Sequence, residues 1–211
     1  MFEIEYKGGN TLIISTKKAT IVTDPKLSLL GLKDIAIKDS VELATEERFA
    51  TNGQDAKLLI EGPGEYGVGD FDILGIPAQR HLDSEADQKK STIYRIEIGD
   101  VRVALIGNIY EKLTDDELEE IGVIDIVILP VGGNGYTLDA TGATGLVGKI
   151  DPKLVIPVHY ADSALKYEVA QDSLDTFVKE LGAPVETVAK YKSKGVSSLP
   201  ASLTVLEITR S

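Results

Sequence analysis

The fold is decided by residues 124–160, which read IDIVILPVGGNGYTLDATGATGLVGKIDPKLVIPVHY. The apolar run at 124–129 predicts a strand that is buried on both faces. A glycine-rich turn follows, then a segment of helical periodicity from 138 to 150, then a second apolar strand at 153–157. This order of elements is typical of an α/β crossover, in which chemistry usually lies at the carboxyl ends of the strands. His159 follows the second strand and is therefore the first candidate functional residue.

Length and composition indicate one globular domain. The chain has 211 residues, of which 43% are hydrophobic and 27% charged, so we expect a single domain that spans residues 1–211. The absence of cysteine excludes disulfides, thiolate zinc sites and cysteine nucleophiles. No apolar run approaches the roughly 18–20 residues of a membrane span, and the first residues lack the pattern of a signal peptide. We therefore expect a cytoplasmic protein.

The charge of the chain limits its partners. The net charge is −12, and the lysine pairs at 17–18 and 89–90 are too short to form basic patches. Neutralising phosphates requires clustered Lys and Arg, so the acidic balance argues against nucleic acids and anionic membranes. We expect a small molecule or another protein as the partner, and neither nucleic acid nor a membrane.

The first half of the chain is rich in predicted strands. Three short β-like stretches at 2–6, 11–15 and 20–23 predict an antiparallel meander, which ends at Asp24 and a proline. Segment 61–69 is the most glycine-rich part of the chain, and it predicts unusual backbone angles or a close approach of two backbones.

The middle of the chain carries a loop, a hairpin and a helix start. Segment 81–90 is polar and predicts an exposed loop, which we consider a candidate mobile lid. The stretches 92–98 and 101–106 are separated by Gly-Asp and predict a β-hairpin. Thr114 and Glu117 form a capping-box pattern, which predicts a short helix after them.

The last third of the chain predicts one more helix and one more strand. Apolar residues recur at three- and four-residue steps over 167–181, and Gly182 supplies the stop of an amphipathic helix. Segment 203–208 predicts a last strand at the edge of a sheet. Strands dominate both halves and helices follow them in each, so we expect two sheets packed face to face with helices outside, a four-layer α/β arrangement.

Five segments in this order resemble the metallo-β-lactamase fold. They are IVTDP (21–25), GPGEY (62–66), GN with LTD (107–108 and 113–115), LPVGG (129–133) and IPVHY (156–160). The resemblance covers roughly residues 10–182 and is closest to a bacterial branch of predicted Zn-dependent hydrolases that are similar to ascorbate-phosphate lactonases. It implies a four-layer αββα sandwich.

The resemblance also implies a metal site. The site of that family resembles a His-x-His-x-Asp-His loop, a His-x-Gly-Asp stretch and a late histidine after a strand. Imidazoles and carboxylates in such a set hold one or two Zn²⁺ ions, which lower the pKa of a bound water to about 7 and so create a hydroxide nucleophile.

This chain departs from those motifs. The first one falls on EERFAT (46–51), which has no histidine and places Arg48 where a ligand belongs. The second falls on LIGN (105–108), where Asn108 replaces the carboxylate. His159 matches the late histidine, and His81 resembles a family position after the GPGEY segment. The chain has only two histidines, fewer than the motifs require.

Three hypotheses follow. The leading one is a degenerate metal site in a non-catalytic binding or interaction module that needs no cofactor, with Asp24, Glu46, Arg48, Asn108 and His159 as candidate ligand-binding residues. The rival is a metal-dependent hydrolase with a reduced zinc site at His81 and His159, helped by Asp24 and Glu46. The third is a metal-free site in the same cleft, in which Arg48 holds a carboxylate or phosphate.

Overall fold

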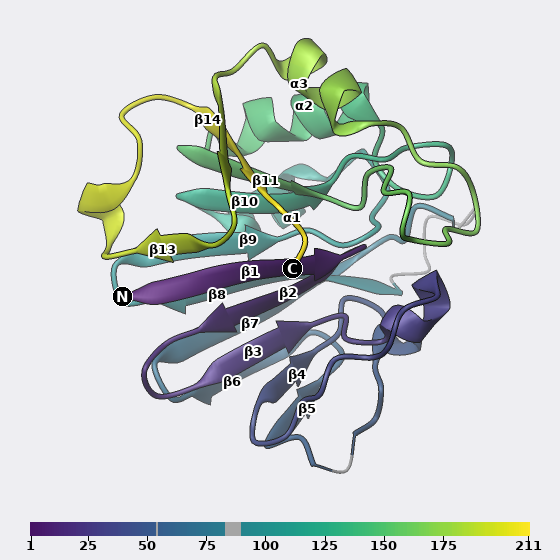
Figure 1. Ribbon diagram of the computed structural model, residues 1–211. Helices are drawn as coiled ribbons and strands as arrows, with labels where there is room; N and C mark the ends of the chain where they lie inside the picture. Colours follow the sequence, from purple (N-terminus) through teal and green to yellow (C-terminus); the bar gives the residue numbers. More distant parts are fainter. Residues whose placement is uncertain (54, 83–89) are drawn as a thin grey trace.

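A computed structural model describes residues 1–53, 55–82 and 90–211. Two sheets face each other in it (Figure 1). The smaller sheet has the strand order β13-β1-β2-β3-β4-β5. Its strands are β1 (Phe2–Gly8), β2 (Thr11–Ser15), β3 (Thr20–Thr23), β4 (Val41–Leu43), β5 (Leu58–Ile60) and β13 (Tyr191–Ser193). Strands β1, β2 and β3 pair antiparallel, which confirms the predicted meander, and β3, β4 and β5 pair parallel.

The larger sheet has the order β12-β14-β11-β10-β9-β8-β7-β6. Its strands are β6 (Gly64–Val68), β7 (Phe71–Ala78), β8 (Ser91–Ile98), β9 (Val101–Leu105), β10 (Ile126–Pro130), β11 (Leu154–Val158), β12 (Val185–Val188) and β14 (Thr204–Ile208). Strands β6 to β9 form antiparallel pairs, which include the predicted hairpin. Strands β9, β10, β11, β14 and β12 are parallel, so their carboxyl ends lie along one edge.

The predicted crossover is present at the centre of the larger sheet. Helix α2 (Ala140–Ile150) joins β10 to β11, and Ile128 lies opposite Ile156 in the parallel pair. Asp139 caps the helix by accepting a hydrogen bond from the Gly142 amide at 2.7 Å. The crossover delivers His159 to the carboxyl edge of the sheet.

Two apolar clusters hold the layers together. One lies between the sheets and includes Ile4, Tyr94 and Ile156. The other lies between the larger sheet and the helices α1 (Asp115–Ile121), α2 and α3 (Leu174–Leu181), and includes Phe177 and Val127. The predicted α/β class, with two sheets packed face to face, is confirmed. Beside the smaller sheet the short 3₁₀ turns η1 (Leu27–Leu30) and η2 (Glu47–Phe49) follow β3 and β4.

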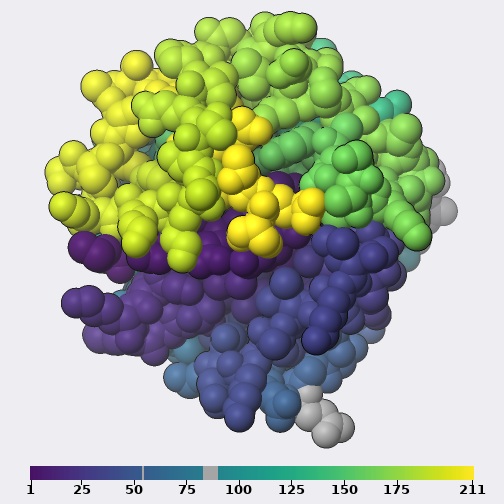
Figure 2. All heavy atoms as spheres, viewed as in Figure 1, coloured from purple at the N-terminus to yellow at the C-terminus, as the bar shows by residue number. Residues whose placement is uncertain are grey.

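The C-terminal residues pack against the first strand of the chain. Figure 2 shows the C-terminal segment, in yellow, packed against the N-terminal strands, in purple. The Ser211 amide donates to the Tyr6 carbonyl at 3.0 Å, and Arg210 pairs with Asp162 at 2.6 Å. These contacts bring the loop that follows β11 beside the β1–β2 turn, far apart in sequence. No helix in the described part of the chain is long and apolar enough to cross a membrane.

Some predicted elements are corrected by the structure. The helix expected over 167–181 begins only at Leu174, because Tyr167 instead places its ring against His159. The last strand is internal, between β11 and β12, and β12 forms the edge. The unusual backbone angles expected in the glycine-rich segment 61–69 are confirmed by positive φ at glycines 64 and 69, and the segment contains strand β6. The candidate lid at 81–90 falls mostly on residues 83–89, outside the described residues.

The predicted capping box is confirmed at the start of α1. The Glu117 amide donates to Thr114 Oγ1 at 3.2 Å, and the Thr114 amide donates to Glu117 Oε2 at 2.9 Å. Replacing Thr114 with alanine removes the hydroxyl that caps the Glu117 amide, so we expect the free energy of unfolding to fall by about 1 kcal/mol in urea titrations. Glu119→Ala, an exposed change on the same helix, serves as the control. Equal stability of the two variants would contradict the prediction.

Candidate functional site

One pocket lies where the ends of β3 and β11 meet the β1–β2 turn and the turn η2. Its volume is about 90 Å³. The polar and aromatic residues that line it include Asn10, Asp24, Arg48, Tyr136, His159 and Tyr167. Three of the predicted ligand-binding residues, Asp24, Arg48 and His159, are therefore brought together.

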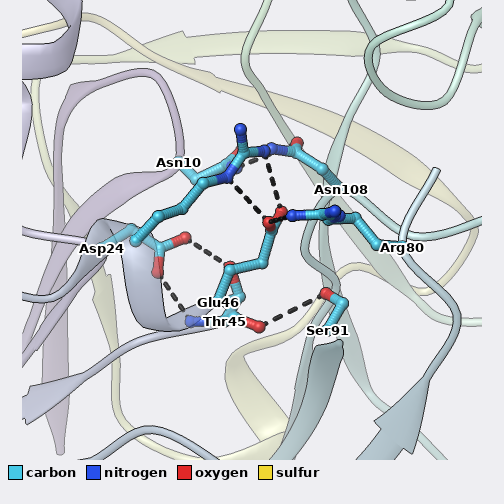
Figure 3. A network of polar contacts seen from close by, with 8 residues as sticks. Asn10, Asp24, Thr45, Glu46, Arg80, Ser91 and Asn108 are labelled. Atoms are coloured by element: carbon cyan, nitrogen blue, oxygen red, sulfur yellow. Dashed lines mark hydrogen bonds and ion pairs between the residues drawn. The ribbon is translucent and has the colours of Figure 1, made fainter. Parts of the chain in front are cut away.

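Asp24 is a buried carboxylate held in a fixed position. It follows β3 with a positive φ of 41°, a conformation that aspartate tolerates better than most residues. Its two oxygens accept hydrogen bonds from the amide and the hydroxyl of Thr45, both at 2.7 Å (Figure 3). Burial raises the pKa of Asp24 to about 7, although the bonds from Thr45 lower it. The carboxyl group therefore titrates near neutrality.

Glu46 is the centre of an ion cluster. Its carboxylate is almost fully buried, and it accepts hydrogen bonds from Nε and Nη2 of Arg48 at 2.8 and 3.2 Å. Arg80 reaches the same carboxylate from the other side, with Nη1 at 3.5 Å (Figure 3). Burial raises the pKa of Glu46, and the two arginines lower it. Arg48 also lies 4.6 Å from the ring centroid of Phe49 and 5.3 Å from that of Tyr136, within cation–π range.

His159 is enclosed by aromatic rings at the end of β11. Its backbone amide donates to the Gly9 carbonyl at 2.9 Å, and its φ of 52° turns the chain sharply after the strand. The imidazole stacks on Tyr136, with centroids 5.4 Å apart and planes 13° from parallel. Tyr167 packs against it with a centroid distance of 4.9 Å. The stacking fixes the plane of the imidazole.

The hydrogen bonds of His159 define its tautomer. Gln171 donates through Nε2 to the Val169 carbonyl at 2.9 Å, so its Oε1 is the atom that faces His159 Nδ1, 3.1 Å away. Because Oε1 can only accept, Nδ1 carries the proton and Nε2 keeps the unshared pair. Burial lowers the pKa of His159 to about 4, so the imidazole is neutral at neutral pH.

A pair of buried amides lies beside this group. Asn10 Nδ2 donates to Asn108 Oδ1 at 3.0 Å, and both side chains are buried. Within the part of the chain that the structure describes, Asn10 Oδ1 and Asn108 Nδ2 have no hydrogen-bond partner. Reversing both amides would exchange the roles of the two atoms, so in either assignment the pair leaves one acceptor and one donor open. Buried polar atoms without partners are uncommon and call for an explanation such as a bound ligand or water.

The remaining predicted residues lie outside the pocket, and some of them contact residues that line it. Glu46 and Asn108 do not line the pocket but contact Arg48 and Asn10, which do. His81 does not line this pocket either, and its Nδ1 lies 3.3 Å from the Ile109 carbonyl. The sequence interpretation did not name three groups of the site. They are Asn10, the tyrosines at 136 and 167, and Gln171.

The donor atoms of the site do not fit a metal ion. Among residues 1–53, 55–82 and 90–211, no group of three or more His, Asp or Glu side chains is arranged to hold one. A catalytic zinc needs three protein ligands. The Glu46 carboxylate is already shared by two guanidinium groups, and Asp24 is hydrogen-bonded to Thr45 through both of its oxygens. His159 is the one imidazole that lines the pocket.

Comparisons with known proteins agree with the fold. A family model described as the beta-lactamase superfamily domain matches residues 3–159. The curated proteins contain no match. Among solved structures, a proposed Zn-dependent hydrolase of the metallo-beta-lactamase superfamily from Thermotoga maritima is similar over 99% of both chains, with 23% identity and a TM-score of 0.79.

Two further structures show how widely this architecture is used. Igni18, a metallo hydrolase from Ignicoccus hospitalis, is 16% identical with a TM-score of 0.66, and the match covers 99% of this chain and 95% of that one. CmlA, a diiron beta-hydroxylase from Streptomyces venezuelae, is 12% identical with a TM-score of 0.65, over 99% of this chain and 53% of that one. At these identities the likeness establishes the fold, and function has to be argued from the site.

Proposed function

The chain belongs to the beta-lactamase superfamily, and from this premise we propose that it is a member that has lost its metal site and binds a small anionic molecule without catalysis. The observation that carries the proposal is the ion cluster of Glu46 with Arg48 and Arg80. By the resemblance of segment 46–51 to the first metal motif, this cluster stands where family members hold their ion.

The charges in the cluster oppose a metal ion. A guanidinium is permanently protonated, so Arg48 and Arg80 keep their charge at every physiological pH. Two unit charges 4 Å apart interact by about 4 kcal/mol at an effective dielectric constant of 20, and a divalent ion doubles that repulsion. Arg48 meanwhile supplies a fixed cation beside Asp24 and His159, which a metal would otherwise supply.

The same arrangement suits an anionic ligand. Arg48 bonds Glu46 through Nε and Nη2, so its Nη1 is not engaged by that carboxylate. Lys26 adds a second cation to the lining. The aromatic rings of Tyr136 and Tyr167 supply rigid walls. Concave sites with apolar walls and a few convergent polar groups are the usual form of small-molecule sites.

The geometry does not favour the rival hydrolase. A reduced zinc site would need His81 and His159 to face one ion, yet His159 lines the pocket and His81 does not. We therefore place no reaction step on either histidine.

The family branch, the domain organisation, the location and the excluded partners are also proposals. The motif resemblance supports a place in the bacterial branch that is similar to ascorbate-phosphate lactonases. The contact of the C-terminal segment with β1 supports a single domain over residues 1–211. The sequence composition supports a cytoplasmic location and argues against nucleic-acid and membrane partners.

A thermal-shift screen of small metabolite anions in the presence of EDTA tests the proposal. We expect some anions to raise the melting temperature without metal, because a ligand that binds the native state alone stabilises it. We expect the shift to disappear in Arg48→Ala and to persist in Lys192→Ala, whose ammonium lies on an exposed strand outside the pocket. NMR spectra of the bound anions should show no conversion over hours. Turnover, or shifts that need zinc, would contradict the proposal.

A further inference from the structure

We propose that the ligand of this pocket is a small α-hydroxycarboxylate with an apolar body, an inference that rests on the function proposed above and adds the chemical class. Three properties of the pocket lead to it: its charge balance, an open hydrogen-bond acceptor and its apolar lining. Each is independent of the others.

The charge balance favours a monoanion over a dianion, because two acids already face the two cations of the lining. The cations that line the pocket are Arg48 and Lys26, and the acids are Asp24 and Glu168. Arg48 is already paired with Glu46. A phosphate monoester carries close to two negative charges near neutral pH, and this lining cannot neutralise both of them. Leaving a buried charge uncompensated is costly, so a carboxylate, with one charge, is the better match.

An open acceptor requires a donor on the ligand. His159 lines the pocket, and its Nε2 keeps the unshared pair because Nδ1 donates to Gln171. A carboxylate alone has no proton to give to this atom. A hydroxyl group can donate to it.

The lining gives the rest of the ligand an apolar character and a small size. The side chains of Leu27, Leu29 and Leu30 come from the turn η1, and Phe49 comes from η2. The cavity volume of about 90 Å³ suits a ligand with a few carbon atoms beyond its polar head. A branched aliphatic body fits these walls.

Calorimetric titration in EDTA with three matched probes tests this class. The probes are α-hydroxyisovalerate, isovalerate, which lacks the hydroxyl, and isobutyl phosphate, which keeps the body and carries the larger charge. We expect the hydroxy acid to bind roughly ten-fold more tightly than each of the others, because a site that bonds a hydroxyl discriminates against its absence. In His159→Ala we expect the preference for the hydroxyl to fall to about two-fold or less. Lys192→Ala should keep the wild-type preference.

The outcomes of the titration distinguish a wrong ligand class from a wrong proposed function. Equal binding of isovalerate, tighter binding of isobutyl phosphate, or no binding of the hydroxy acid at millimolar concentration overturns the ligand class. Any of these results leaves metal-free anion binding standing if other anions still stabilise the protein in EDTA. Binding of the probes only after zinc is added overturns both.

Discussion

Arg48→Ala is expected to lower the free energy of unfolding by about 2–3 kcal/mol, which corresponds to a fall in melting temperature of about 5–10 °C. The variant leaves the buried Glu46 carboxylate with Arg80 as its remaining cation, at 3.5 Å. Removing one partner of a fully buried ion pair costs about 3–5 kcal/mol. The estimate here is smaller because the Arg48 side chain is 30% exposed and solvent screens part of the loss.

A double variant and an exposed pair supply the controls. Glu46→Gln combined with Arg48→Ala removes the uncompensated charge, so we expect it to recover part of the lost stability in a double-mutant cycle. Lys192→Ala breaks an ion pair with Glu3 whose lysine is 65% exposed, and we expect a change of no more than about 0.5 kcal/mol. A loss in Arg48→Ala that is no larger than in Lys192→Ala would show that the cluster does not stabilise the site.

Two variants are expected to change the pH dependence of stability in opposite directions. The pKa of Asp24 is raised to about 7 in the folded state. Between about pH 4 and pH 7 the Asp24 carboxyl is therefore protonated in the folded state and ionised in the unfolded state. The contribution of Asp24 to stability is therefore full at low pH and is lost as the pH rises from 4 to 7. The pKa of His159 is lowered to about 4, so its contribution is full above about pH 6.5 and is lost as the pH falls to 4.

In the wild type the pH-dependent contributions of Asp24 and His159 to stability largely cancel between about pH 4 and 6.5. Asp24→Asn removes the first contribution, so the stability of this variant relative to the wild type should rise by up to about 4 kcal/mol from pH 4 to 7. His159→Gln removes the second, so its relative stability should fall by up to about 3 kcal/mol from pH 4 to 6.5. Urea unfolding at a series of pH values measures both differences. Parallel profiles for all three proteins would contradict the assigned protonation states.

Much of the fold could be predicted because its elements are encoded locally. The apolar strands β10 and β11 and the cap at Thr114 depend on neighbouring residues, and the structure has them as expected. The pattern at 167–181 misled because helical spacing of apolar residues also occurs by chance in a loop. There the tertiary contact of Tyr167 with His159 decides the structure instead. The position of β14 inside the sheet depends on pairing with β11 and β12, which no local pattern specifies.

The site could be predicted only in part for the same reason. Asp24, Arg48 and His159 were found because they fall within or next to segments that resemble family motifs, and the structure brings them into one pocket. The tyrosines that hold His159 and the amide of Asn10 lie outside those motifs. Asn10 finds its partner Asn108 nearly a hundred residues along the chain, a relation that only the folded structure shows.

The zinc content of the purified protein shows whether an arginine–glutamate cluster stands where related proteins hold a metal. The protein would be incubated with excess zinc, passed through a gel-filtration column without chelator and analysed by mass spectrometry of the elements, beside a zinc hydrolase treated identically. We expect far less than one zinc per chain in this protein, while the hydrolase keeps its metal. One zinc per chain, lost in both His81→Ala and His159→Ala, would contradict this expectation.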